Sequence, residues 1–155
     1  MADSPKDVFE KLMKVNLDAF EGFRTASDNS NDKRLTTVFD QTALERKKFA
    51  RYWASRLDDP SYKTDLKADL HRFWMDLKTG SMKFQATRIL KECKKGEKHA
   101  LKTYEELEKS DLGSEELEEL NQQKRQIAAM LDQLDDLLNT FEKRDTDRNQ
   151  DMYMR

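Results

Sequence analysis

The chain has 155 residues, enough for one domain with a substantial hydrophobic core. Charged residues make up 39% of it and hydrophobic residues 36%, and this composition, with few glycines and prolines, favours long amphipathic helices. The 29 basic and 31 acidic residues are well mixed and leave a net charge of -2, so the charge gives no indication of a nucleic-acid-binding surface.

Cysteine content and hydropathy bear on the compartment. Cys93 is the only cysteine, so no intramolecular disulfide can form, and a reducing compartment fits. No stretch reaches the apolar length of a membrane span, and the N-terminus carries no apolar run of the signal-peptide type. We therefore expect a cytoplasmic protein with no membrane partner.

Apolar residues recur at helical spacing in four long segments. The predicted helices are, in chain order, Ser4 to Ser27, Lys33 to Leu57, Met82 to Lys109, and Ser114 to Phe141. A shorter segment, about Tyr62 to Lys78, is too long for a turn and predicts a helical crossover that lets the third long helix run parallel to the second. The fold class is therefore all-α, a four-helix bundle with a short helical crossover between its second and third helices.

The predicted domain covers residues 1–141. From Glu142 to the C-terminus the sequence is polar and aperiodic, which predicts a disordered tail over residues 142–155. Inside the domain Cys93 lies on an apolar stripe, so we expect a buried and inert thiol.

Four polar residues lie on the apolar stripes or directly beside them, one in each long helix. They are Glu21, Glu45, Glu97 and Gln123. Carboxylates placed in this way are typical of bundle-core dimetal sites, which take a Glu from each of two helices and Glu-x-x-His from each of the other two. These four residues are the candidate metal ligands, with iron or manganese as the metal.

The histidines that would complete such a site are missing. No Glu-x-x-His occurs in the chain, His71 falls in the crossover, and His99 is two residues past Glu97. We therefore expect no cofactor and a degenerate dimetal site. The four polar residues would then form a hydrogen-bonded core layer, in which Lys48, Lys124 or Tyr104 could be partners, or most of them would face solvent.

Three segments carry a resemblance to a known family. Residues 12–23 read LMKVNLDAFEGF, residues 70–78 read LHRFWMDLK, and residues 89–104 read ILKECKKGEKHALKTY. In this order and spacing they resemble the bacterial ferritin-like four-helix-bundle proteins classed as a domain of unknown function. The resemblance runs from about Val8 to Phe141, and the HRxWMD and ECxxGE segments are its most specific parts.

The resemblance implies a ferritin-like fold and a bacterial, cytoplasmic protein, and it suggests a role in stress. Members often carry histidines at positions that align near Phe49 and Leu131, both apolar here. Gly22 and Gly96 match family glycines, and each could allow a neighbouring helix to approach closely at a cost of roughly 1 kcal/mol relative to Ala.

Three functions remain open on this basis. The first is a non-enzymatic bundle that binds a protein partner or self-associates into a homo-oligomer. The second is a carboxylate-rich metal-binding or iron-oxidising protein. The third is a helical adaptor that docks through an apolar face of the crossover, such as Phe73 and Leu77.

Overall fold

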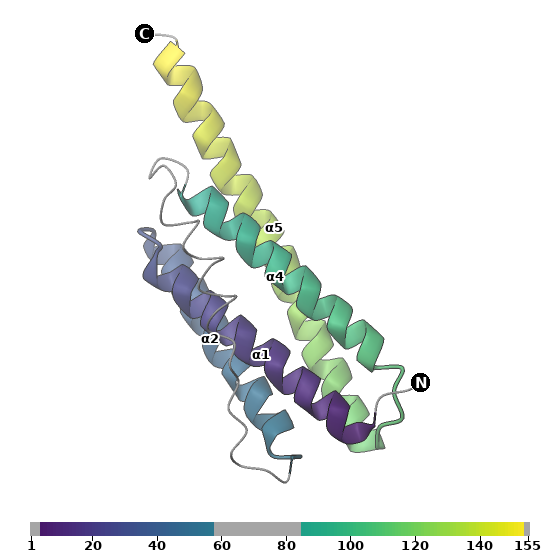
Figure 1. The fold of residues 1–155 in the computed structure, drawn as a ribbon. Coiled ribbons are helices and arrows are strands. Elements are labelled where there is room, and N and C mark those ends of the chain that lie inside the picture. Colours follow the sequence, from purple (N-terminus) through teal and green to yellow (C-terminus); the bar gives the residue numbers. More distant parts are fainter. Residues whose placement is uncertain (1–3, 58–84, 154–155) are drawn as a thin grey trace.

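The computed structural model describes residues 4–57 and 85–153 of the chain. The described residues form four α-helices and no strand, α1 (Pro5–Asp28), α2 (Lys33–Ala54), α4 (Gln85–Leu107) and α5 (Ser114–Tyr153) (Figure 1). This confirms the all-helical class and agrees with a four-helix bundle. The predicted crossover, with Phe73 and Leu77, lies outside the described residues.

Local side-chain chemistry starts the first two helices where the sequence predicts. The Ser4 hydroxyl caps α1 by accepting from the Asp7 backbone N–H at 3.3 Å, and Pro5 occupies the first turn. The Asp32 carboxylate caps α2 by accepting from the Leu35 N–H at 3.0 Å. Each cap satisfies a backbone donor that the first turn of a helix leaves without an internal partner.

The hydrophobic core consists of two clusters, one toward each end of the bundle. The first joins the C-terminal half of α1, the N-terminal halves of α2 and α4, and the C-terminal half of α5. Its buried members include Phe23, Phe39, Ile89, Leu134 and Phe141. The second joins the opposite halves, and its buried members include Leu12, Trp53, Ala100, Leu120 and Ile127. The helix directions follow from these partners: α1 and α5 run one way, and α2 and α4 run the other.

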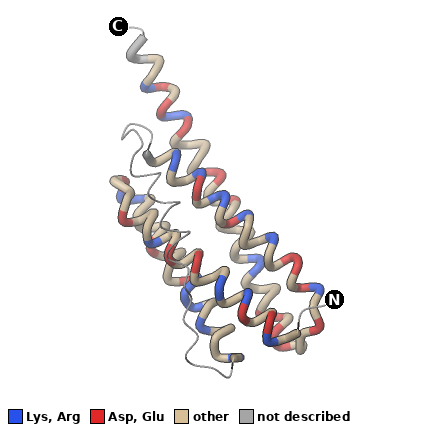
Figure 2. The backbone as a smooth tube through the Cα atoms, in the orientation of Figure 1, with Lys and Arg blue, Asp and Glu red and all other residues tan. Residues whose placement is uncertain are grey.

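The two hairpins α1–α2 and α4–α5 therefore lie against each other with α2 parallel to α4. α1 packs against both α2 and α4, and α4 packs against α5 (Figure 1). Basic and acidic residues are interleaved along the helices (Figure 2). No helix in the described ranges has the length and apolar character needed to cross a membrane.

Several helix ends differ from the predictions: α1 ends at Asp28, one residue after the predicted Ser27, and α4 ends at Leu107, two residues before the predicted Lys109. α2 is helical to Ala54, short of the predicted Leu57. α5 continues to Tyr153, past the predicted end of this helix at Phe141, so residues 142–153 are helical in the structure where the sequence predicted a disordered tail. This last part of α5 projects beyond the start of α4 (Figure 1). Its first turns have partners in α4, because the Thr87 hydroxyl donates to Asp145 at 2.8 Å and Lys91 Nζ lies 3.6 Å from Glu142.

Gly96 does not have the predicted role. It is exposed on α4, and a Cβ added to it would meet no atom within 4 Å. No neighbouring helix in the described part of the chain therefore needs the space that a glycine leaves at this position. Its backbone φ is also not positive, so the conformational freedom of glycine is not required.

Candidate functional site

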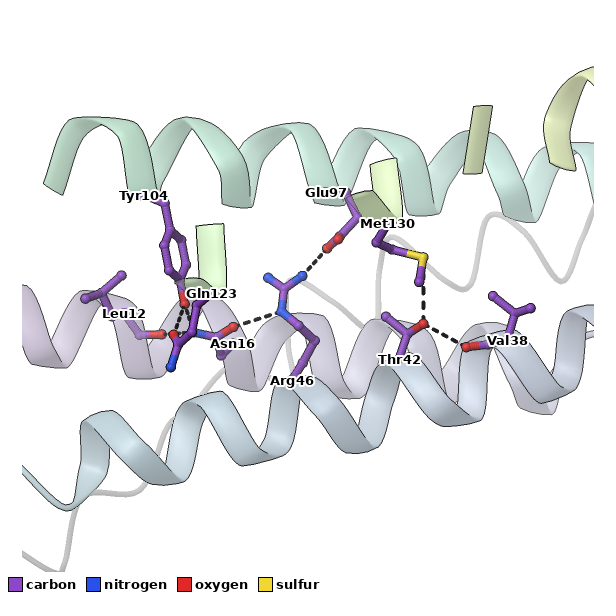
Figure 3. Close-up of polar contacts among 9 residues, drawn as sticks. All are labelled: Leu12, Asn16, Val38, Thr42, Arg46, Glu97, Tyr104, Gln123 and Met130. Atoms are coloured by element: carbon purple, nitrogen blue, oxygen red, sulfur yellow. Dashed lines mark hydrogen bonds and ion pairs between the residues drawn. The ribbon is translucent and has the colours of Figure 1, made fainter. Parts of the chain in front are cut away.

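A layer of hydrogen-bonded polar side chains starts between the two apolar clusters and extends into the second, and every helix contributes to it (Figure 3). Its fully buried polar members are Asn16 of α1, Arg46 of α2, Glu97 of α4 and Gln123 of α5, each no more than 1% exposed. Buried polar groups are tolerated only when they are hydrogen-bonded or paired, so the contacts of these side chains decide what the layer can do.

An ion pair across the interior is the centre of this layer. Arg46 reaches from α2 toward α4, and its Nη1 donates to Glu97 Oε1 at 2.5 Å (Figure 3). Its Nε donates to Asn16 Oδ1 on α1 at 2.8 Å. One guanidinium thus ties three helices together, and its permanent charge neutralises the buried carboxylate.

The network continues toward the second apolar cluster through neutral groups. Asn16 Nδ2 donates to Tyr104 Oη at 2.7 Å and also to the Leu12 carbonyl at 2.7 Å. Tyr104 Oη donates in turn to Gln123 Oε1 at 2.6 Å. The same Gln123 oxygen accepts from Trp53 Nε1 at 2.7 Å, so both lone pairs of this amide oxygen are used.

The network reaches the surface at its far end. Gln123 Nε2 donates to Glu119 Oε1 at 3.0 Å, one turn earlier on α5 and half-buried. From Glu97 to Glu119 the polar groups therefore form one connected series. Because its members come from four helices, the series fixes the axial positions of the helices relative to one another.

Burial raises the pKa of three groups in or beside the layer. It raises the pKa of the Glu97 carboxyl, against the effect of Arg46, and the negative charge of Glu45 adds to the rise. Burial raises the pKa of Tyr104 to about 12. Burial, with the charges of Glu97 and Glu92, raises the pKa of the Cys93 thiol well above its usual range, so this cysteine is protonated at neutral pH.

The structure separates the four predicted ligands into two groups. Glu97 and Gln123 lie in the core layer, whereas Glu21 and Glu45 are half-buried. The side chain of α2 that points inward is Arg46, one residue after the predicted Glu45. Among the residues that the structure describes, no group of three or more His, Cys, Asp or Glu side chains is placed to hold a metal ion.

Of the three predicted partners for the core layer, only Tyr104 belongs to it. Lys48 is exposed on α2, and Lys124 Nζ pairs with Glu108 at 2.6 Å on the outside of the α4–α5 hairpin. Both lysines lie on the polar faces of their helices. The exposed Lys48 side chain keeps its ammonium group in water, as is usual for lysine, whereas the half-buried Lys124 ammonium is paired with Glu108.

Sequence reasoning missed Arg46 and gave no role to Asn16. A signal for both was present in the spacing of the buried residues. On α2 the buried residues include Leu35, Phe39, Thr42, Arg46, Phe49 and Trp53, with Ala43 and Ala50 beside them. Their separations alternate between four and three, the seven-residue repeat of packed helices, and Arg46 continues this repeat where Glu45 would break it.

The fold and the polar core together define an all-helical bundle with an internal ion pair. The sequence matches the family described as "Domain of unknown function (DUF2383)" over residues 5–110, which is more than half of the chain. The protein therefore belongs to this family. The match covers α1, α2 and α4, and ends before α5. No curated protein and no solved structure matches the chain.

Proposed function

We propose that this protein is a ferritin-like, non-enzymatic helical bundle with a degenerate dimetal site, in which the Arg46 guanidinium has replaced the metal. The observation that carries the proposal is the buried Arg46–Glu97 pair at the centre of the polar layer. A bundle-core carboxylate needs a cation to be stable in low dielectric. Here that cation is part of the chain.

The donor set supports the same conclusion. A dimetal site takes oxygen or imidazole ligands from all four helices. In this core α2 turns a cation inward, and the oxygen of Gln123 already accepts from Tyr104 and Trp53. The positions near which family members often carry histidines are occupied by Phe49, which is buried, and Leu131, which is half-buried.

The activity that remains for such a bundle is binding, either to another protein or to a second copy of this chain. The likeness to ferritin-like proteins also supports a bacterial, cytoplasmic and stress-related role. Sedimentation equilibrium over a wide concentration range tests self-association directly. A mass that stays monomeric, together with failure to recover a specific partner, would contradict the binding role.

One observation favours a second function, a carboxylate-rich metal-binding or iron-oxidising protein. Glu45 is close enough to Glu97 for its charge to raise the pKa of that carboxyl. A buried carboxylate with a second, half-buried carboxylate near it is the beginning of a hard-metal site. In this case Glu21 and Gln123 would complete the ligands.

Metal content per chain distinguishes the two functions. The full chain is incubated aerobically with iron(II), manganese(II) or zinc, freed of loose metal and measured by elemental analysis. Our proposal predicts less than stoichiometric metal in the wild type, in Glu45→Ala and in Glu97→Ala alike, with the surface variant Lys48→Ala as the matched control. Stoichiometric metal that is lost in both glutamate variants and kept in Lys48→Ala would favour the metal-binding protein.

A further inference from the structure

The charged residues of α4 and of the turn that follows it are separated by sign. Residues 88–102 contain six basic and two acidic residues, and one of these acids is the buried Glu97. Residues 105–119 contain eight acidic residues and one basic residue. Figure 2 shows blue residues predominating along α4 and red ones around the turn into α5. The α4–α5 hairpin is therefore positive along part of its length and negative at its end.

This distribution of charge opposes the dipole of α4. A helix favours acidic side chains in its first turn and basic ones in its last turn. The described part of α4 has neither, and its first turn carries Arg88 while its last turn carries Glu105 and Glu106. The arrangement does not stabilise α4 itself, so any gain from it comes from contacts outside the helix.

Four exposed side chains in the C-terminal part of α4 can make such a contact. They are Lys98, Lys102, Glu105 and Glu106. Their spacing of three and four residues from Lys102 puts them on one face of the helix. Lysines nearer the start of α4 are paired within the molecule, for example Lys94 with Asp135 at 2.6 Å. None of the four forms an ion pair with a residue in the described part of the chain.

The order of these four charges makes the face complementary to itself. Along the helix they read plus, plus, minus, minus, and an antiparallel second copy reads minus, minus, plus, plus. A two-fold axis between Lys102 and Glu105 therefore places each positive pair opposite a negative pair, and every contact occurs twice. A partner that is only acidic would match the two lysines but would be repelled by the two glutamates, and a basic partner would have the reverse problem.

We propose that the exposed C-terminal part of α4 is a self-association surface. Two copies of this chain pair antiparallel on it, through Lys98 and Lys102 of one copy and Glu105 and Glu106 of the other. The inference rests on the self-association proposed above and names the surface that mediates it. Because these side chains are exposed to solvent, salt screens their attraction, and the contact is tighter at low ionic strength than at high ionic strength.

Sedimentation equilibrium of the full chain and of two charge-reversed variants tests this surface. We expect wild-type dimers at about 0.01 M ionic strength, where charges act over about 30 Å, and dissociation at about 1 M, where they act over about 3 Å. Lys98→Glu/Lys102→Glu and Glu105→Lys/Glu106→Lys should each raise the dimer dissociation constant by about tenfold or more, because like charges then face each other. An equimolar mixture of the two variants should associate as the wild type does, since opposite charges again meet.

The matched control is Lys48→Glu/Arg51→Glu, which makes the same change in net charge at exposed positions of α2 and should leave the dissociation constant unchanged. Circular dichroism of each variant shows whether its helices are intact. A wild type that stays monomeric at low ionic strength would overturn this inference and self-association together, and would leave binding to another protein. A wild-type dimer that neither reversal weakens, or a variant mixture that does not associate, would overturn this surface and leave self-association intact.

Discussion

At the scale of single residues, Arg46 determines the character of the core. Its side chain is 1% exposed, and it donates to Glu97 on α4 and to Asn16 on α1. The aliphatic stem of an arginine packs with apolar neighbours while the planar head makes directed hydrogen bonds. A lysine at this position would provide the charge without the fixed fork of donors.

Removing one member of the buried pair should destabilise the fold. We expect Arg46→Met to lower the free energy of unfolding by about 3–5 kcal/mol, because it leaves the Glu97 carboxylate buried without its cation. The double variant Arg46→Met/Glu97→Leu should recover most of this loss, since it removes both charges and keeps apolar volume. Urea denaturation of the three proteins measures both effects.

The exposed pair between Lys94 and Asp135 is the matched control. Its two atoms are 2.6 Å apart, but the side chains are 29% and 42% exposed, so Lys94→Met should cost less than about 1 kcal/mol. If Arg46→Met lowers the free energy of unfolding no more than Lys94→Met does, the buried Arg46–Glu97 pair contributes no more to stability than an exposed pair. Our account of this core would then be wrong.

The titration of Glu97 should appear in the pH dependence of stability. Its folded-state pKa is raised, chiefly by burial, so folding favours the protonated form. The stability that protonated Glu97 contributes to the folded state is fully present below the ordinary carboxyl pKa of about 4.3. It is lost as the pH rises through the raised pKa of the folded state. The free energy of unfolding of the wild type should therefore fall relative to that of Glu97→Gln over this window.

Denaturation of both proteins in a series of buffers from about pH 4 to about pH 8 measures this difference. The groups that act on Glu97 are Arg46, which opposes the rise in its pKa, and Glu45, which adds to it. Glu45→Gln should accordingly shift the window to lower pH. A difference between wild type and Glu97→Gln that does not change with pH would contradict the raised pKa.

At the scale of the helices, α4 carries a glycine that its environment does not require. Gly96 is exposed, and a Cβ would meet nothing within 4 Å. We expect Gly96→Ala to raise the free energy of unfolding by about 1 kcal/mol, because alanine is the better helix former and loses less backbone entropy. Thermal unfolding followed by circular dichroism measures this. A loss of stability would indicate the close helix approach that the sequence suggested.

The end of α5 is the second helical feature with a measurable consequence. Residues beyond Phe141 remain helical to Tyr153, and the first of them contact α4 through Asp145 and Glu142. A chain that ends at Phe141 should therefore lose far-UV helical signal per molecule as well as length. An unchanged helical signal per molecule would mean that these residues are not helical in solution, as the sequence had predicted.

At the scale of the whole molecule, the polar layer and the two apolar clusters join the hairpins into one unit. Tyr104 Oη connects Asn16 of α1 to Gln123 of α5, and Trp53 of α2 reaches the same glutamine. Because each helix contributes to both clusters and to the layer, no hairpin can leave without exposing the core of the other. The described helices should therefore unfold together.

This cooperativity can be measured with two probes. In a Trp74→Phe background Trp53 is the only tryptophan, so its fluorescence follows the α1–α2 hairpin, while circular dichroism follows all helices. The two urea transitions should coincide. Adding Tyr104→Phe should lower their shared midpoint by the equivalent of about 0.5–1.5 kcal/mol without separating them. Two separated transitions would show that the hairpins unfold independently.

The sequence by itself determined the helices, because helical periodicity and capping are local properties. α1 begins at Ser4, its cap, where the sequence predicts the start of a helix, and Glu97, Gln123 and the buried Cys93 lie on the inward stripes that the apolar spacing indicates. One polar residue per helix was also predictable. The predicted residue is the one that enters the polar layer on α4 and α5, where it is Glu97 and Gln123. On these two helices the neighbouring apolar residues leave only one face that can point inward.

The seven-residue repeat on α2 points to Arg46, but only the tertiary structure decided that its charge is paired inside the core and that Asn16, in place of Glu21, represents α1 in the layer. Adjacent positions on a helix differ by about 100° in direction, and a pattern read at 3.6 residues per turn drifts from the seven-residue repeat that packed helices follow. A buried arginine is stable only with a partner, and that partner, Glu97, is 51 residues away on another helix. No local pattern around Arg46 contains this information.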